Sequence, residues 1–229
     1  MAVCIKSLIQ NMNLVIGCDI GCSYCYARNN ARRFHMTDDF ETPEYFPQKL
    51  RLMDKARPQN FLLTGMSDFA GWIPEWRDEV FAKIAQNPQH QYLLLTKRPD
   101  RVCFSTNLDD VWFGVTVTSN KEKGRIATLH ERIHCRHYYV TFEPMFDDVG
   151  QVDLSGIEWV VIGTETGRRK GKSVSQPEWV LNLAHQAHAM DIPVFMKEDL
   201  LPVIGAERMI QELPRAFCRV LEARYKWQK

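Results

Sequence analysis

The stretch Trp159-Val160-Val161-Ile162-Gly163-Thr164-Glu165 has the pattern that decides the fold. An unbroken apolar run is followed at once by polar residues. A short continuous apolar run is typical of a strand that is buried on both faces of a parallel sheet. Similar runs recur along the chain, and we predict a strand at each. They are Leu14–Gly17, Phe61–Thr64, Tyr92–Thr96, Trp112–Val117, Tyr138–Phe142, Trp159–Gly163 and Pro193–Met196.

Amphipathic helical patterns lie between several of these runs. The segment Glu75–Gln86 carries its apolar residues on one helical face, and we predict further helices over Lys121–Ile133 and from Pro177 onward. Strand–helix–strand order predicts right-handed crossovers between parallel strands. About six or seven such units predict an α/β fold, a partial (β/α)6-7 TIM-type barrel with parallel strands. An open doubly wound sheet is the alternative.

The domain organisation follows from length and composition. A chain of 229 residues can bury one sizeable core, and 45% hydrophobic with 25% charged residues is typical of a globular protein rather than a disordered or fibrous one. We predict that residues 1–205 form the partial barrel. Residues 206–229 have the pattern of a C-terminal helical extension, interrupted at Pro214, which we expect to pack on the same domain.

Charge and cysteine content restrict location and partners. The 29 basic and 28 acidic residues give a net charge of +1, so any attraction to nucleic acid must be local. No apolar run is long enough for a spanning helix, and the first residues lack a signal-peptide pattern, so we expect no membrane association and a cytoplasmic location. Seven cysteines without a secretory signal favour reduced thiols and metal ligands over disulfides.

Three of these cysteines form the motif CxxxCxxC. Cys18, Cys22 and Cys25 directly follow the first predicted strand, and Gly17 and Gly21 let the backbone wrap closely around a bound group. Three thiolates on one loop can ligate three irons of a [4Fe-4S] cluster and leave the fourth iron without a protein ligand. A structural zinc site completed by the nearby His35 and a set of inert buried thiols are the alternatives.

Polar residues follow the other predicted strands, where active sites of parallel α/β folds are built. The runs are Gly65-Met66-Ser67-Asp68, Thr96-Lys97-Arg98, Thr116-Val117-Thr118-Ser119, Thr141-Phe142-Glu143-Pro144, Gly163-Thr164-Glu165-Thr166-Gly167 and Lys197-Glu198-Asp199. Charged side chains at this edge could grip a charged substrate or neutralise cofactor charge, while the alternative is an ion-pair network that lines the barrel mouth. The candidate catalytic residues are Lys97, Glu143, Glu165 and Lys197.

A basic loop, Gly167-Arg168-Arg169-Lys170-Gly171-Lys172-Ser173, follows the sixth predicted strand. Its spacing is one residue short of a Walker A motif, and it does not open the domain, so we exclude nucleoside triphosphate binding. Arg168 to Lys172 could contact the phosphates of a nucleic acid or another anion, and the alternative is a solvated basic loop. Arg28, Arg32 and Arg33 would extend this basic rim.

The cysteine motif resembles the signature of the radical SAM superfamily, CxxxCxΦC, whose aromatic residue Φ is Tyr24 here. The resemblance implies a partial barrel of the radical SAM kind. It also implies that Cys18, Cys22 and Cys25 hold a [4Fe-4S] cluster whose open iron chelates S-adenosylmethionine, with Tyr24 against the adenine. An electron from the cluster would then split the sulfonium to a 5′-deoxyadenosyl radical that acts on the substrate.

Further site residues are implied by the same resemblance. Many members carry a TGGE-like run after the second strand that holds the methionine amino group. The equivalent run here is Thr64-Gly65-Met66-Ser67-Asp68, in which the second glycine is missing and the acid comes one place later. The ends of the fourth strand usually contact the ribose and carboxylate. The residues at that position are Thr116, Thr118 and Ser119.

Several runs resemble a radical SAM subfamily carried by phages and mobile elements, whose substrate is unassigned. The runs are Leu95–Pro99, Phe142–Pro144, Ile157–Gly163 and Phe195–Lys197. We therefore hypothesise a radical enzyme whose substrate is unidentified, with a nucleic acid or nucleotide as the candidate class. It would receive electrons from an external donor such as flavodoxin or ferredoxin and would act alone or with a protein partner. The alternatives are a non-catalytic zinc or iron-sulfur module that binds nucleic acid, and a degenerate cluster protein that assists another radical enzyme.

Overall fold

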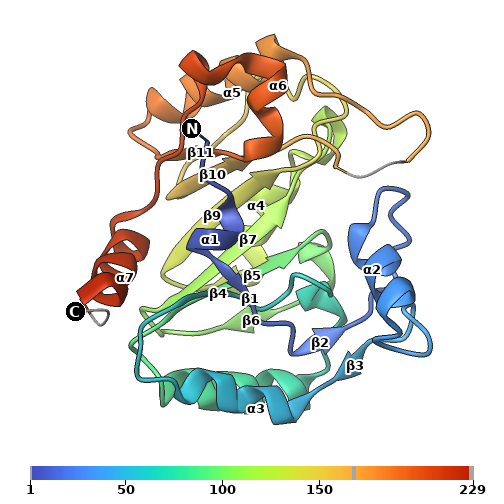
Figure 1. Ribbon diagram of the computed structural model, residues 1–229, viewed down its shortest axis with the longest axis vertical. Helices are drawn as coiled ribbons and strands as arrows, with labels where there is room; N and C mark the ends of the chain where they lie inside the picture. Colours follow the sequence, from blue (N-terminus) through green and yellow to red (C-terminus); the bar gives the residue numbers. More distant parts are fainter. Residues whose placement is uncertain (1, 167–168, 227–229) are drawn as a thin grey trace.

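The computed structural model describes residues 2–166 and 169–226, and a curled parallel sheet lies at its centre (Figure 1). Within the described residues this sheet has seven strands in the order β1-β4-β5-β7-β9-β10-β11. The strands are β1 (Gln10–Asn11), β4 (Asn60–Leu62), β5 (Gln91–Thr96), β7 (Val111–Thr116), β9 (His137–Phe142), β10 (Trp159–Ile162) and β11 (Val194–Met196). Every neighbouring pair is parallel, and the spatial order follows the chain. The molecule is therefore a mixed α/β fold whose sheet forms a half-barrel.

The first predicted strand does not belong to this sheet. Val15–Ile16 forms β2, which pairs antiparallel with β3 (Glu44–Tyr45) in a separate ribbon. The apolar side chains of β2 are buried, but the first place in the main sheet is taken by β1, whose two residues are polar and exposed. A polar, exposed strand at the edge of a sheet has no run of apolar residues by which it could be predicted from the sequence. Gly17 forms an isolated parallel bridge with Ser67, in the segment that follows β4.

Three helices cover the convex face of the sheet. They are α3 (Pro74–Ala85), α4 (Arg125–Arg132) and α5 (Pro177–His188). Each buries an apolar stripe in the main hydrophobic cluster, together with the outward-facing residues of the strands. The predicted helix over Lys121–Ile133 is two elements, because the 3-10 turn η4 (Asn120–Glu122) ends before Gly124 and α4 begins after it.

Not every crossover contains a long helix. The connection from β5 to β7 holds only η3 (Pro99–Arg101) and β6 (Phe104–Ser105), and β6 pairs with β8 (Ile133–His134). The connection from β9 to β10 contains no helix either. Apart from the helices at the two ends of the chain, the other helical elements are α2 (Tyr26–Phe34), η1 (Pro47–Asp54), η2 (Phe69–Gly71), η5 (Glu198–Leu200), α6 (Leu201–Ile204) and η6 (Ala206–Arg208).

The two ends of the chain pack on the other face of the sheet. Helix α1 (Ile5–Leu8) and helix α7 (Arg215–Lys226) join a second cluster made by inward-facing strand residues. The ring of Phe217 lies 4.7 Å from Trp112 and 5.3 Å from Trp159, centroid to centroid. Of the predicted C-terminal helical extension, the described residues up to 226 are helical at η6 and in α7, and Gln211 between them pairs with Phe195 in extended backbone.

Gly114 lets aromatic side chains fill the inside of the half-barrel. A Cβ at this position would lie 2.6 Å from the ring of Tyr139. Tyr139 is almost fully buried and donates its hydroxyl hydrogen to the Leu94 carbonyl at 3.1 Å. The Tyr139 ring on β9 thus occupies the space that a side chain at Gly114 on β7 would fill. In the part of the chain that the structure describes, no helix has the length and apolar content needed to cross a bilayer.

Candidate functional site

A cavity of about 470 Å³ opens at the carboxyl ends of the parallel strands. The cysteine loop, the ends of β4, β5, β7, β9 and β11, and helix α1 contribute to its wall. Most of the residues singled out in the sequence meet there. Those that line the cavity are Cys18, Cys22, Tyr24, Cys25, Gly65, Met66, Ser67, Asp68, Lys97, Thr116, Glu143, Glu165 and Lys197.

The cysteine loop is held against the end of β4 by backbone contacts. The Gly17 amide donates to the Met66 carbonyl at 3.0 Å, and the Cys18 amide donates to the Phe40 carbonyl at 2.7 Å. Gly17 has a φ of 120°, and a Cβ there would lie 2.8 Å from backbone atoms of Thr42 and Pro43. Glycine is therefore required where the chain enters the loop.

The three thiols are free, partly buried and on one wall of the cavity. Cys25 caps α2, and its Sγ accepts a hydrogen bond from the Arg28 amide at 3.3 Å. Burial raises the pKa of the Cys18 thiol to about 11. Ligation by a metal would therefore displace a proton from Cys18.

The donor set fits an iron-sulfur cluster, whose usual protein ligands are thiolates. None of the three thiols is used in a disulfide. Among the described residues, no three His, Cys, Asp or Glu side chains are already gathered around one point as metal ligands. His35 cannot serve as the fourth ligand of a zinc site with the three cysteines. It caps the opposite end of α2, about 15 Å along the helix from Cys25.

Tyr24 and Lys97 lie together beside the cysteine loop. The ring of Tyr24 packs edge-on against Phe146 with centroids 5.1 Å apart, and Lys97 Nζ lies 5.8 Å from the Tyr24 centroid. The Tyr24 pKa lies above its ordinary value, chiefly because the hydroxyl is buried. The flat ring and the ammonium group therefore form one wall of the cavity next to the thiols.

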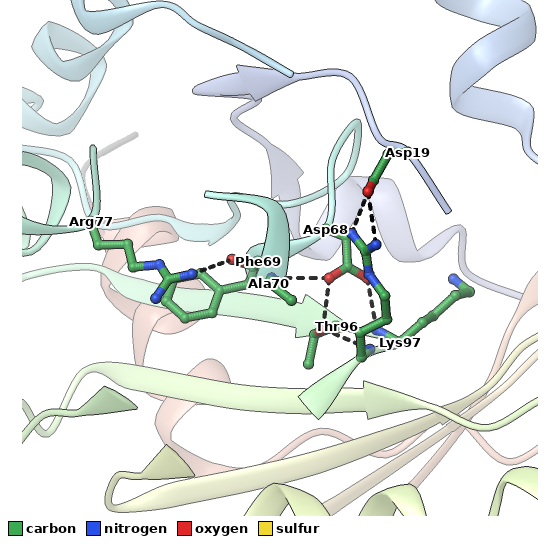
Figure 2. A network of polar contacts seen from close by, with 8 residues as sticks. Asp19, Asp68, Phe69, Ala70, Arg77, Thr96 and Lys97 are labelled. Atoms are coloured by element: carbon green, nitrogen blue, oxygen red, sulfur yellow. Dashed lines mark hydrogen bonds and ion pairs between the residues drawn. The ribbon is translucent and has the colours of Figure 1, made fainter. Parts of the chain in front are cut away.

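Asp68 joins the ends of two strands (Figure 2). Its carboxylate accepts hydrogen bonds from Thr96 Oγ1 at 2.6 Å, from the Lys97 amide at 2.7 Å and from the Ala70 amide at 3.0 Å. Both oxygens are engaged in these contacts, so the carboxylate fixes the β4 and β5 ends in register with one another. Asp68 lies on the cavity wall, but its carboxylate oxygens already accept hydrogen bonds from protein groups.

An ion pair attaches the cysteine loop to the same strand end. The Arg98 guanidinium forms a two-point contact with the Asp19 carboxylate, in which Nη1 and Oδ2 are 3.0 Å apart (Figure 2). The contact lowers the pKa of Asp19 and raises that of Arg98. Asp19 lies between Cys18 and Cys22, so this pair holds the loop over the end of β5.

Glu143 and Lys197 form an ion pair at the far side of the cavity, at the ends of β9 and β11. A Cβ on Gly163 would lie 3.1 Å from side-chain carbons of both residues, so the glycine at the end of β10 leaves room for the pair. Burial lowers the Lys197 pKa, but Glu143 and Asp199 outweigh it and hold that pKa above its ordinary value. Lys197 is therefore positively charged at neutral pH.

Glu165 is engaged by the basic loop. Its carboxylate accepts from Arg169 Nε at 2.6 Å, from Arg169 Nη2 at 2.7 Å and from the Ser173 amide at 3.0 Å. Arg169 lowers the pKa of Glu165. Arg168 lies outside the described residues. Lys170 and Lys172 are exposed, and neither contacts a carboxylate within the described part of the chain.

The predicted hydroxyl residues at the end of β7 and just beyond it differ in their position relative to the cavity. Thr116 lines the cavity, and its Oγ1 accepts from Thr141 Oγ1 at 3.1 Å. Thr118 and Ser119 do not line it. The Thr118 amide and hydroxyl both donate to Glu122, at 2.8 Å and 2.6 Å, because the chain turns into η4 there. Thr118 and Ser119 therefore lie outside the cavity wall, although the Thr118 carbonyl accepts from the Phe146 amide at 2.8 Å, beside the Tyr24 ring.

Sequence reasoning missed several wall residues. Tyr26 donates its hydroxyl hydrogen to the Gly65 carbonyl at 2.6 Å, and burial raises its pKa to about 12. Ile5 comes from the N-terminal segment, and Tyr139 and Trp159 come from inward-facing strand positions. Tyr26 directly follows the cysteine motif and could have been found there, whereas the others needed the curvature of the sheet.

Comparison with known proteins gives a family for the chain. No curated protein and no solved structure matches it. The family described as "Protein of unknown function (DUF5131)" matches residues 4–224. Because this match covers nearly the whole sequence, the chain belongs to the DUF5131 family.

Proposed function

We propose that this chain is a radical SAM enzyme with one [4Fe-4S] cluster, and that its half-barrel is of the radical SAM kind. One observation carries the proposal. The three thiols of the CxxxCxxC motif and the aromatic residue within it share a cavity at the carboxyl ends of parallel strands. This is the edge at which parallel α/β folds place their active sites. The resemblance of the motif to the superfamily signature supports the same assignment.

Cys18, Cys22 and Cys25 would ligate three irons and leave one iron for S-adenosylmethionine. When bound, the cluster supplies the electron that splits the sulfonium and yields the 5′-deoxyadenosyl radical. The protein fixes the loop through the Gly17 contact to Met66 and the Asp19–Arg98 pair. The flat face of Tyr24 suits the adenine ring.

The remaining wall residues orient the cofactor and exclude water. Gly65, Met66 and Ser67 bring backbone groups to the cavity, and Asp68 positions that turn rather than offering a free carboxylate. Thr116 offers a hydroxyl at the end of β7, where the ribose would lie. Lys97 lies beside Tyr24 and supplies positive charge for an anionic group of the cofactor or substrate.

We propose a nucleic acid or nucleotide as the substrate. Lys170 and Lys172 are exposed basic residues on the loop that Glu165 holds by the cavity, where they could contact phosphates. The Glu143–Lys197 pair lies inside the same cavity and could bind polar substrate groups. The reaction also requires an external one-electron donor such as flavodoxin or ferredoxin, and a protein partner could contribute to recognition.

Metal content tests the ligand assignment. Anaerobically reconstituted protein should contain about four iron and four sulfide per chain. The variants Cys18→Ser, Cys22→Ser and Cys25→Ser should each lose most of both. Cys103→Ser, which removes an exposed cysteine away from the loop, should retain both. Zinc bound without iron and sulfide would refute the enzyme assignment and favour a zinc module that binds nucleic acid.

A further inference from the structure

The half of the cavity beneath α1 differs in character from the half beside the cysteine loop. Its wall is made by apolar side chains from the inward face of the sheet and from the N-terminal segment. They are Ile5, Ile9, Leu62, Leu93, Tyr139, Trp159 and Val161. We refer to this part of the cavity as the α1 subsite. It contains none of the groups that the proposed cofactor needs.

The two aromatic residues of the α1 subsite have their polar atoms directed elsewhere. The Tyr139 hydroxyl donates to the Leu94 carbonyl, and Trp159 Nε1 donates to the Glu212 carbonyl, both at 3.1 Å. Their ring centroids are 5.9 Å apart. Because each donor is already used, the surface that these side chains present to the cavity is carbon, and it is small, since Tyr139 is 2% and Trp159 is 1% exposed. A charged group placed against this surface would lose its hydration without compensation.

Hydrogen bonds fix the N-terminal segment over the α1 subsite, and we refer to this segment as the roof of the subsite. Glu198 accepts from the Ile5 amide at 3.3 Å and from Cys4 Sγ at 2.8 Å. Gln211 exchanges two hydrogen bonds with the backbone of Val3, at 2.7 Å and 2.8 Å. The roof is thereby fixed to the β11 side of the sheet and keeps Ile5 above the apolar wall.

Charged side chains border this apolar wall, and Lys6, Glu198 and Asp199 line the cavity along with Glu143 and Lys197. The Glu143–Lys197 ion pair lies where Gly163 leaves space at the end of β10, next to Val161 on the same strand side. A ligand that enters from the strand ends therefore meets a charged pair first and an apolar chamber beyond it. This order suits a molecule with a polar remainder and an uncharged planar ring.

We propose that the α1 subsite receives an uncharged aromatic ring of the substrate, while polar groups of the same molecule meet Glu143 and Lys197. The inference deepens the proposed function and rests on it only in treating the cavity as a substrate chamber. A nucleobase is a ring of this kind. Aromatic walls favour such a ring over an aliphatic or charged group of similar size, through offset or edge-on ring contacts.

Binding of indole, a neutral planar probe, tests the proposal without any need for cofactor cleavage. Ligand-observed NMR titration of the full chain should give saturable binding. Val161→Phe and Ile5→Trp, which fill the subsite from the floor and from the roof, should each weaken it about tenfold or more. Val174→Phe makes the same change at a valine that is 52% exposed and should leave the dissociation constant unchanged.

Thermal unfolding of each variant establishes that it is folded before its binding is compared. Equal indole affinity in wild type and both filling variants would overturn the proposal, and so would a folded wild-type protein that binds no indole. Tighter binding of benzylammonium than of indole would also overturn it, since that result assigns a charged ligand to the pocket. Failure of S-adenosylmethionine cleavage is a separate measurement, so loss of the proposed function is distinguishable from loss of the subsite.

Discussion

At the scale of single residues, buried carboxylates have different roles according to their partners. Asp68 and Glu165 were both candidate site residues, and both have their oxygens engaged by neighbouring protein groups. Asp199 is the opposite case, because its carboxylate oxygens are buried and lack a hydrogen-bond partner among the described residues. Burial raises the pKa of Asp199 to about 6. From the sequence, all three residues are predicted to be acids near strand ends. The sequence does not reveal which of them has hydrogen-bond partners in the fold.

Asp110, far from the cavity at the start of β7, allows a pH prediction. Burial raises the pKa of this carboxyl from 3.8 to about 6, and its Oδ2 has no hydrogen-bond partner in the described structure. The folded state thus holds the proton more tightly than the unfolded state. The contribution of Asp110 to the free energy of unfolding is therefore greatest below pH 3.8, falls as pH rises toward about 6, and stays low above it.

The variant Asp110→Asn should consequently be more stable than wild type at pH 7, by about 1 kcal/mol, because it removes an unpaired buried charge. Urea denaturation at a series of pH values measures the difference. The gain should shrink as the pH falls toward 4. A variant that is less stable at pH 7 would show that the charged form of Asp110 is solvated by the fold.

At the scale of elements, the packing inside the sheet depends on a glycine of β7, Gly114, that leaves room for the Tyr139 ring on the neighbouring strand β9. Gly114→Ala should destabilise the protein by about 1 to 3 kcal/mol, since the added methyl would lie 2.6 Å from the Tyr139 ring. Gly124→Ala is the matched control, because a Cβ at Gly124 meets nothing within 4 Å. It should be neutral or slightly stabilising. Equal effects of the two substitutions on chemical denaturation would contradict this account of the inner layer.

The strands of the half-barrel were largely predictable from the sequence. The run at 159–163 gave β10, and the runs beginning at Tyr92, Trp112 and Tyr138 gave β5, β7 and β9, because strands buried on both faces have no polar alternation. β1 was missed because its two residues are polar and lie at the sheet edge. Val15–Ile16 was assigned to the wrong sheet, since burial alone does not reveal the pairing partner.

At the scale of the whole molecule, curvature decides which residues meet. The rule that strand ends share one edge predicted that Lys97, Glu143, Glu165 and Lys197 would lie near the cysteines, and all of them line the one cavity. The rule does not predict that the chain turns away after Val117, which removes Thr118 and Ser119 from the cavity. Nor does it predict that the N-terminal segment covers the α1 subsite, because Val3 and Ile5 are held there by residues about 200 positions away in sequence.

The central claim is that the cysteine loop and its cavity support reductive cleavage of S-adenosylmethionine. The most direct measurement is chromatographic quantification of 5′-deoxyadenosine after anaerobic reduction of the cluster-loaded protein with dithionite in the presence of S-adenosylmethionine. The account predicts 5′-deoxyadenosine from wild type and from Cys103→Ser, and none above background from Cys22→Ser. A fully loaded wild-type cluster that forms no 5′-deoxyadenosine would contradict the claim and favour a cluster protein that assists another radical enzyme.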